Sequence, residues 1–250
     1  MAPVDFSGVN RDGAMMRSRP PVNLPWIAGR FREVPHGLGA DVAIFRVDIP
    51  ADVSVSPQLV GHGELERAAR IRDPVERGFL LASHAVLRSV LADALGKSAA
   101  QLELYRDEFG KPRLADGSLR FNMSRSHSAT LIGLSVGAEI GLDIELIRKL
   151  PDAAVVAREC LSSQEYAQWR RLDAASAMPA LLQCWARKEA CLKAAGIGLA
   201  GAPERLDAGW RRDDLPERMS LRHGARNWDT VVVSLPVPPE LVAAAAVVVA

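Results

Sequence analysis

Two acidic residues near the middle of the chain have the types and spacing to bind a divalent metal ion. Asp143 and Glu145 alternate with apolar residues in the segment 140–147, which predicts a strand. Side chains alternate between the faces of a strand, so both carboxylates project together while their apolar neighbours face the core. Carboxylates this close repel each other, and a hard dication, Mg²⁺ or Mn²⁺, is their natural partner. A solvated sheet face is the ordinary alternative for this pattern.

A second group of this kind lies along one face of a helix further on. The segment 178–195 is rich in Ala and Lys and is followed by Gly196, which predicts a helix that ends there. Trp185, Glu189 and Lys193 are spaced four apart and share a face. The ordinary alternative is a core tryptophan beneath a surface ion pair worth about 0.2–0.5 kcal/mol.

Cationic and hydroxyl side chains gather in the segment that precedes the acidic strand. Residues 120–128 carry both types, and Arg106 and the turn 110–112 lie shortly upstream. Guanidinium, ammonium and hydroxyl donors are the groups that hold phosphate. A basic, serine-rich loop that makes only turn hydrogen bonds is the alternative.

The composition limits the function classes to consider. The 250 residues carry 31 basic and 30 acidic side chains, so no nucleic-acid partner is expected and any phosphate binding must come from a local cluster. Three cysteines without a CxxC spacing argue against a disulfide framework or a zinc site and favour a reducing, cytoplasmic location. The N-terminus lacks the apolar run of a signal peptide, and no apolar stretch reaches the roughly 18 residues of a membrane span, so no membrane is expected.

Periodicity and turn residues place the other elements. Strands are predicted at 42–49, 101–105, 119–122, 129–135, 140–147, 219–222, 230–235 and 241–249, and helices at 64–95 with a break near Pro74, at 162–172 and at 178–195. His84 is interpreted as a packed or surface histidine rather than a ligand. We expect an α/β (α+β) fold with residues 1–40 as a loosely structured arm, 41–136 as an N-terminal half and 137–250 as a C-terminal half.

In this order and spacing, the segments resemble those of the Sfp-type 4′-phosphopantetheinyl transferases. The family's signatures are a G-K-P turn, an F-N-x-S-H-S segment, a G-x-D-x-E strand and a W-x-x-K-E-x-x-x-K helix that ends in G-x-G. Here they correspond to residues 110–112, 121–126, 141–145 and 185–198, and the likeness extends from about residue 64 to about residue 201. The resemblance implies two similar α/β halves in a pseudo-twofold arrangement, with the site between them.

The resemblance also implies a role for each residue of the acidic group. Asp143, Glu145 and Glu189 would bind Mg²⁺, or Mn²⁺ in its place, together with the pyrophosphate of coenzyme A. Lys193 would contact the same pyrophosphate and stabilise charge on the leaving phosphate. Glu189 is the candidate base for the attacking hydroxyl, with Lys193 as the second catalytic residue. Lys188 points about 100° away around the helix, so we expect it to support a contact with substrate or carrier.

Further residues match family positions that contact coenzyme A. They are Arg67, Arg106, Lys111, Asn122, Ser124, Arg125 and Lys193, and those from 111 to 125 would bind the adenosine 3′-phosphate. The family's usual histidine is Arg125 here, and a histidine follows at position 127. An arginine is always charged and offers a planar pair of donors, so phosphate binding should persist with less dependence on pH. Whether Arg125 or His127 contacts phosphate stays open.

The implied function is Mg²⁺-dependent transfer of the phosphopantetheine arm of coenzyme A to a serine of an apo acyl carrier protein or peptidyl carrier domain. Adenosine 3′,5′-bisphosphate is the second product. We expect a monomer with a basic surface near the site, since such carriers are usually acidic. One alternative is a non-catalytic coenzyme A-binding or regulatory protein of the same fold, which would not need the full acidic set. Another is a Mg²⁺-dependent hydrolase of the coenzyme A pyrophosphate.

Overall fold

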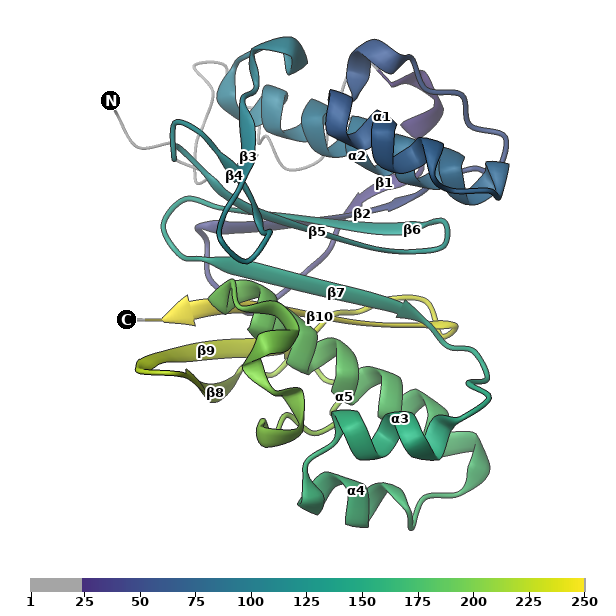
Figure 1. The fold of residues 1–250 in the computed structure, drawn as a ribbon, viewed down its shortest axis with the longest axis vertical. Helices are drawn as coiled ribbons and strands as arrows, with labels where there is room; N and C mark the ends of the chain where they lie inside the picture. The colour runs from purple at the N-terminus through teal and green to yellow at the C-terminus, as the bar shows by residue number, and fades with distance from the viewer. Residues whose placement is uncertain (1–23, 250) are drawn as a thin grey trace.

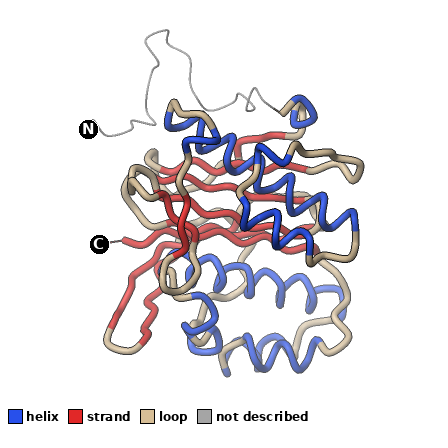
Figure 2. Tube along the Cα trace, turned by 45° about the horizontal axis from the view of Figure 1, so that its top comes forward, coloured by secondary structure: helices blue, strands red, loops and turns tan. Residues whose placement is uncertain are grey.

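The computed structural model describes residues 24–249, which form four layers (Figure 1). Helices cover the first of two antiparallel sheets, the second sheet packs beneath it, and further helices cover the second sheet. Figure 2 shows the strands in red between helices in blue. The strands of each four-stranded sheet come from one part of the chain, residues 31–135 for the first and 140–249 for the second. The predicted α/β fold class is confirmed.

Between residues 24 and 135, the described part of the chain contains six strands and two α-helices. They are β1 (Phe31–Glu33), β2 (Val42–Asp48), α1 (His62–Ala69), α2 (Pro74–Leu95), β3 (Leu104–Arg106), β4 (Pro112–Leu114), β5 (Arg120–Ser126) and β6 (Ala129–Ser135). The sheet order is β1-β2-β6-β5, and β3 and β4 pair separately as a hairpin.

The second part contains four strands and three α-helices. They are β7 (Ile140–Leu146), α3 (Ala153–Cys160), α4 (Ser163–Trp169), α5 (Ala174–Ala195), β8 (Glu217–His223), β9 (Arg226–Ser234) and β10 (Leu241–Val249). The sheet order is β7-β10-β9-β8. Short 3₁₀ turns occur at Pro25–Ile27, Pro57–Leu59, Ala99–Gln101, Gly198–Gly201 and Pro203–Arg205.

A shared hydrophobic core joins the two sheets. Ile44 and Leu131 of the first sheet belong to the same buried cluster as Leu142, Ile144 and Ala243 of the second. The outer strands β5 and β7 therefore run close to each other where the sheets meet, as Figure 1 shows. The cross-sheet core fixes the position of β7, which carries the predicted acidic pair.

Two helices of equal length organise the two parts. Helices α2 and α5 each have 22 residues. Asp73 caps the first turn of α2 and Asp173 that of α5, and each helix ends at a glycine in the left-handed conformation, Gly96 or Gly196. The predicted helix ends are confirmed, whereas α5 begins four residues earlier than predicted because Asp173 caps it there.

Helix α2 differs from one expectation made from the sequence. By length and hydropathy, Pro74–Leu95 is apolar enough to cross a membrane, so the statement that no stretch is long and apolar enough was wrong for this helix. Within the fold, 67% of its most apolar 18-residue window is buried. It packs on the first sheet through residues such as Val86 and Leu91, which is typical of a core helix.

Several elements differ from those predicted. Residues 24–40, expected within a loose arm, contribute β1 and the buried Leu24 and Ile27, while residues 1–23 lie outside the described residues. Strand β5 continues to Ser126 instead of ending at residue 122, and residues 99–101 form a 3₁₀ turn before β3. Strand β4 and helix α3 were not predicted.

Candidate active site

Helix α5 lies directly against strand β7 at Gly141. A Cβ atom on residue 141 would lie 2.1 Å from the Ala190 carbonyl oxygen and 2.3 Å from the Ala194 amide nitrogen, so only glycine allows this approach. Because side chains alternate along a strand, Asp143 and Glu145 leave β7 on the same side as Gly141, the side that α5 covers. The glycine of the G-x-D-x-E signature therefore brings the helix next to the two carboxylates.

Asp143 connects the three elements of the site. Its buried carboxylate oxygen Oδ1 accepts a hydrogen bond from the Ser124 hydroxyl at 2.9 Å and one from the Lys193 ammonium at 2.6 Å. The same ammonium lies 3.8 Å from Glu189 Oε2. Strand β5 supplies Ser124, strand β7 supplies Asp143, and helix α5 supplies Lys193 and Glu189. The structure thus brings together the two groups that the sequence placed on separate elements.

Alternate residues of β5 face β7. The Ser126 hydroxyl lies 3.2 Å from Glu145 Oε2, to which it donates, and accepts a hydrogen bond from the Leu146 amide at 3.0 Å. Four residues earlier on β5, the side-chain oxygen Oδ1 of Asn122 accepts a hydrogen bond from the Leu142 amide at 2.9 Å. The sequence prediction treated Ser126 only as part of a polar segment, because nothing in the sequence shows that β5 runs alongside β7.

The three carboxyl groups have raised pKa values. Burial raises the pKa of Glu189 to about 7, and Asp143 and Glu145 add to the increase against the opposing charge of Lys193. Burial also raises the pKa of Asp143, and burial together with the charge of Asp143 raises that of Glu145. Burial acts to lower the pKa of Lys193, but the carboxylates of Asp143, Glu189 and Glu145 together outweigh it, so the net shift is upward. The cluster holds excess negative charge that a cation would relieve.

Two oxygen atoms of this cluster have no hydrogen-bond partner. They are Asp143 Oδ2 and Glu189 Oε1, and both are buried. Within residues 24–249, no three Asp, Glu, His or Cys side chains are close enough to form a ready-made metal site, and the Lys193 ammonium supplies the nearby positive charge. The donors nevertheless fit a hard dication, because unpaired carboxylate oxygens from two elements are available to it. Asp143, Glu145 and Glu189 are the residues that would hold Mg²⁺.

A cleft of about 800 Å³ opens beside the acidic cluster. Ser124 and Lys193 line the cleft and also contact Asp143, so the two features share a boundary. The charged basic side chains along its walls are Arg67, Arg88, Arg106, Arg125 and Lys193; two histidines, His62 and His84, and the acidic Glu64 and Glu103 also line it. Because the chain as a whole carries nearly balanced charge, any phosphate binding was expected to depend on a local basic cluster, and this cleft contains one. Such a cluster suits a ligand with several phosphate groups.

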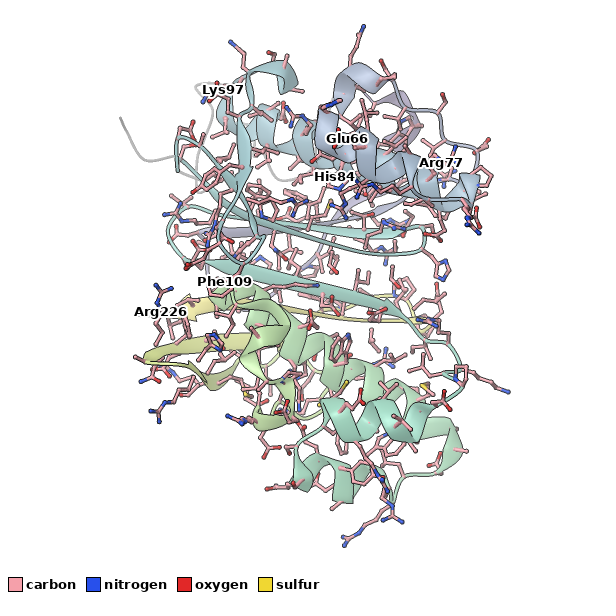
Figure 3. All side chains as sticks on the ribbon, viewed as in Figure 1. Glu66, Arg77, His84, Lys97, Phe109 and Arg226 are labelled. Carbon is pink, nitrogen blue, oxygen red and sulfur yellow. The ribbon has the colours of Figure 1, made fainter. Side chains whose placement is uncertain are left out.

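His84 is packed, one of the two positions that the sequence left open, and it also lines this cleft (Figure 3). Its Nδ1 lies 3.8 Å from Glu64 Oε1. Burial lowers the pKa of His84 to about 4 against the opposing charge of Glu64, and three arginines of the cleft add to the decrease. The imidazole is therefore neutral at pH 7.

Arg125 and His127 share one carboxylate, that of Glu76 at the start of α2. Arg125 Nη1 lies 2.9 Å from Glu76 Oε2, and His127 Nδ1 lies 3.0 Å from Glu76 Oε1. Arg125 lines the cleft, whereas His127 occupies the turn between β5 and β6 with a φ of 50°. Of the two alternatives left open by the sequence, Arg125 is the better placed to contact a phosphate in the cleft.

The remaining predicted coenzyme A contacts divide into two groups. Arg67 and Arg106 are exposed on the cleft walls, although Arg106 also donates to the Gly110 carbonyl at 2.7 Å. Asn122 lines the cleft while its side-chain oxygen is bonded to β7. Lys111 is not among the described residues that line the cleft, and its ammonium is buried and bonded within the protein.

The positions of two further residues of α5 bear on their predicted roles. Lys188 was expected to contact substrate or carrier, but it is fully buried and pairs with Glu165, which could not be foreseen because the two lie 23 residues apart. Trp185 was a core tryptophan in the ordinary alternative for this helix face. It is half-buried, and it is not among the side chains that form the hydrophobic clusters of residues 24–249.

The chain is similar to known proteins, and part of the similarity covers segments that form the site. The family model of the 4′-phosphopantetheinyl transferase superfamily matches residues 139–245, a range that contains β7 and α5. The 4′-phosphopantetheinyl transferase HetI of Nostoc sp. is 30% identical over 174 residues, which cover 67% of this chain and 73% of that protein. The chain belongs to the 4′-phosphopantetheinyl transferase superfamily. Membership confirms the family resemblance and the enzyme class, while the Sfp-type subgroup stays a prediction.

Other members of the superfamily share shorter stretches with the chain. A putative 4′-phosphopantetheinyl transferase of Synechocystis sp. is 33% identical over 146 residues, 57% of this chain and 59% of that protein. An L-aminoadipate-semialdehyde dehydrogenase-phosphopantetheinyl transferase of Rattus norvegicus is 24% identical over 170 residues, 63% of this chain and 55% of that protein.

Proposed function

We propose that the enzyme transfers 4′-phosphopantetheine from coenzyme A to a serine hydroxyl of an apo acyl carrier protein or peptidyl carrier domain in a Mg²⁺-dependent reaction. The serine oxygen forms a bond to the β-phosphorus of coenzyme A, and the bond from that phosphorus to the bridging pyrophosphate oxygen breaks. Adenosine 3′,5′-bisphosphate leaves with the electron pair of the broken bond.

One observation carries this proposal. Two acidic residues with unpartnered buried oxygens, Asp143 and Glu189, meet Lys193 at the edge of a cleft lined by basic side chains. A binding protein would have no need of buried carboxylates without partners, since such groups are costly to bury. A Mg²⁺ ion held by Asp143, Glu145 and Glu189 would neutralise the pyrophosphate and act as a Lewis acid.

The protein's own groups have distinct tasks in this proposal. Glu189 accepts the proton of the serine hydroxyl, because its Oε1 has no hydrogen-bond partner and Lys193 lies on the side of its other oxygen, 3.8 Å from Oε2. Lys193 moves from Asp143 toward the leaving phosphate and stabilises its charge. Arg67, Arg106 and Arg125 line the cleft where the remaining phosphate of coenzyme A would bind.

The proposal extends to the setting in which the enzyme acts. We propose a monomeric, cytoplasmic protein that meets an acidic carrier through exposed basic side chains near the carboxylate strand. Arg148 and Lys149 follow β7 directly and are exposed, so they are candidates for this contact. Association should weaken as salt is added, because exposed charges are screened.

Incubation with coenzyme A, Mg²⁺ and a panel of apo carriers tests the proposal by mass spectrometry. We expect one or more carriers to gain the mass of phosphopantetheine, and omission of Mg²⁺ to prevent the gain. Free phosphopantetheine without carrier modification would identify a hydrolase instead, and bound but unchanged coenzyme A would identify a binding protein. Asp143→Asn should abolish the gain, whereas Asp116→Asn, which changes an exposed aspartate paired with Lys97, should not.

A further inference from the structure

The Lys111 side chain makes three hydrogen bonds within the protein. Its ammonium lies 2.8 Å from Glu139 Oε2, 3.0 Å from the Ile140 carbonyl oxygen and 3.2 Å from the Ala194 carbonyl oxygen. Only 6% of the side chain is exposed. An ammonium group has three N–H donors and no acceptor, so every donor of Lys111 already has a partner.

A contact between Lys111 and a phosphate would break at least one of these bonds. Lys111 lines a recess of about 230 Å³ that shares Asn122 and Lys193 with the large basic cleft, but Lys111 itself is not among the described residues that line that cleft. Lys111 is therefore placed as an internal cation rather than as a residue that contacts a ligand.

The acceptors of Lys111 belong to the two elements that carry the acidic cluster. The carbonyl of Ile140 is at the start of β7, three residues before Asp143. The carbonyl of Ala194 is in the last turn of α5, next to Lys193. Carbonyls in the last turn of a helix lack intrahelical partners and attract cations.

The hairpin that carries Lys111 is anchored to the second part of the chain at further points. Arg113 also pairs with Glu139, and Glu108 pairs with Arg226 at 3.3 Å. Phe109 contacts His223 edge-on, with ring centroids 6.2 Å apart. Figure 3 shows Phe109 and Arg226 close to each other at this junction. The hairpin β3–β4 of the first part thus reaches across to β7, β8 and β9, with Lys111 as its buried contact.

We propose that Lys111 is a positioning residue that ties the start of β7 to the end of α5 and does not contact coenzyme A. The tie holds Asp143 and Glu145 opposite Glu189 and Lys193. Its catalytic importance rests on the proposed transfer and its effect on metal affinity on the proposed metal site, whereas its effect on stability rests on neither.

Lys111→Met tests the proposal, with Lys97→Met as the control because Lys97 pairs with Asp116 on the surface (Figure 3). We expect Lys111→Met to lower the unfolding midpoint by several degrees and the affinity for Mn²⁺, measured by calorimetry, by about tenfold, the size of effect seen when groups that orient metal ligands are removed. Turnover should fall by a similar factor with the Michaelis constant for coenzyme A within about twofold. Lys97→Met should change none of these.

Binding of adenosine 3′,5′-bisphosphate without metal separates positioning from phosphate contact. This molecule carries the phosphates that a ligand-binding lysine would contact, and its affinity for Lys111→Met should stay within about twofold of that of the unchanged enzyme. A tenfold loss of this affinity at an unchanged unfolding midpoint would overturn the proposal.

A second variant covers the case in which Lys111→Met does not fold. Glu139→Gln keeps the ammonium and its two carbonyl partners, and it should show the same pattern of lower midpoint and weaker Mn²⁺ binding to a smaller extent. An unchanged midpoint and unchanged Mn²⁺ affinity in Glu139→Gln would contradict the proposal. If the unchanged enzyme transfers nothing to any carrier, the midpoint and the Mn²⁺ affinity still decide the role of Lys111.

Discussion

Two buried charged clusters lie on different sides of helix α5, and they differ in how completely their polar atoms are paired. The structural cluster joins Lys188 to Glu165, with Lys188 also donating to the Cys160 and Pro203 carbonyls. Glu165 accepts further hydrogen bonds, from the Ala208 and Gly209 amides at 2.8 Å each among others. The acidic cluster of Asp143, Glu145 and Glu189 instead keeps two buried oxygens without a partner.

The pKa values of the two clusters shift in opposite directions. Burial acts to raise the pKa of Glu165, but the hydrogen bonds from Lys188 and from the Ser162 amide outweigh it, so the pKa lies below its usual value. For Glu189 burial prevails, and the pKa rises to about 7. Both glutamates are buried and both have a lysine nearby. The number of donors therefore separates a carboxylate that stabilises the fold from one that is available to a ligand.

The largest expected effect separates function from stability at the acidic cluster. Glu189→Gln should reduce transfer by about 10³-fold or more, since it removes both a candidate base and a candidate metal ligand. The unfolding midpoint should be unchanged or higher, because repulsion within the cluster falls. Carrier modification by mass spectrometry and thermal unfolding measure the two effects, with Glu159→Gln, an exposed position on α3, as the control. Turnover near that of the unchanged enzyme would remove Glu189 from the site.

The opposite outcome is expected in the structural cluster. Glu165→Gln should lower the free energy of unfolding by about 3–5 kcal/mol, because Lys188 is left buried without a counter-charge. The fraction that remains folded should transfer phosphopantetheine at the usual rate. Urea unfolding checks the loss, and Glu204→Gln, at an exposed pair with Arg205, should change stability by less than about 0.5 kcal/mol. A loss of transfer without a loss of stability would reverse the roles assigned to the two clusters.

Gly141 connects the acidic cluster to its helix, so a substitution there should affect stability and activity together. Gly141→Ala should cost about 2–3 kcal/mol, because the added methyl group meets the α5 backbone and displaces the helix. Transfer should fall as Glu189 and Lys193 move with it. Chemical unfolding and kinetic assays measure the pair of effects. Gly137→Ala adds a methyl group where nothing lies within 4 Å, and equal losses in both variants would argue against the packing explanation.

His84 extends the comparison to the basic cleft, where a buried group lacks compensation for its positive form. Its folded pKa of about 4 lies below the usual 6.5, so the unfolded chain binds the proton more strongly and stability falls as the pH drops below about 6.5. Between pH 7.5 and pH 5 this residue should remove about 2 kcal/mol of stability. The difference in unfolding free energy between the unchanged enzyme and His84→Gln, measured at both pH values, isolates this contribution. A difference that does not vary with pH would show that His84 has an ordinary pKa.

The smallest effect concerns the choice between Arg125 and His127. Arg125→Ala should raise the Michaelis constant for coenzyme A about tenfold, equivalent to about 1.4 kcal/mol, with a smaller change in turnover. His127→Asn should leave the constant within about twofold, since His127 lies in the turn outside the cleft lining and Asn tolerates its positive φ. Steady-state kinetics with both variants decides between them. The reverse order of effects would make His127 the phosphate contact.

The sequence predicted those features of the fold and the site that depend on local patterns. The lengths of α2 and α5 were largely predictable because their apolar spacing stops at Gly96 and Gly196. The joint projection of Asp143 and Glu145 followed from the alternation of a strand, and the structure confirms it.

Features that depend on distant partners could not be predicted in this way. Strand β5 was expected to end at residue 122 because its last residues are polar, yet Ser124 and Ser126 are polar because they face β7 rather than water. The same limit applies to the buried lysines. Lys111 resembles a phosphate ligand by type and position, and only the folded chain shows that Glu139 and two carbonyl groups already occupy its donors.

The contact between β5 and β7 also affects whether strands of other protein chains can pair with these two sheets. Each is the outermost strand of its sheet, and an open strand edge is a template on which another chain can add. Here the outward amides of Leu142 and Leu146 donate to the side chains of Asn122 and Ser126, so side chains of β5 cover part of the β7 edge without main-chain pairing. A chain in which the two sheets have folded but not yet met would present both edges at once, and that intermediate is where self-association would begin.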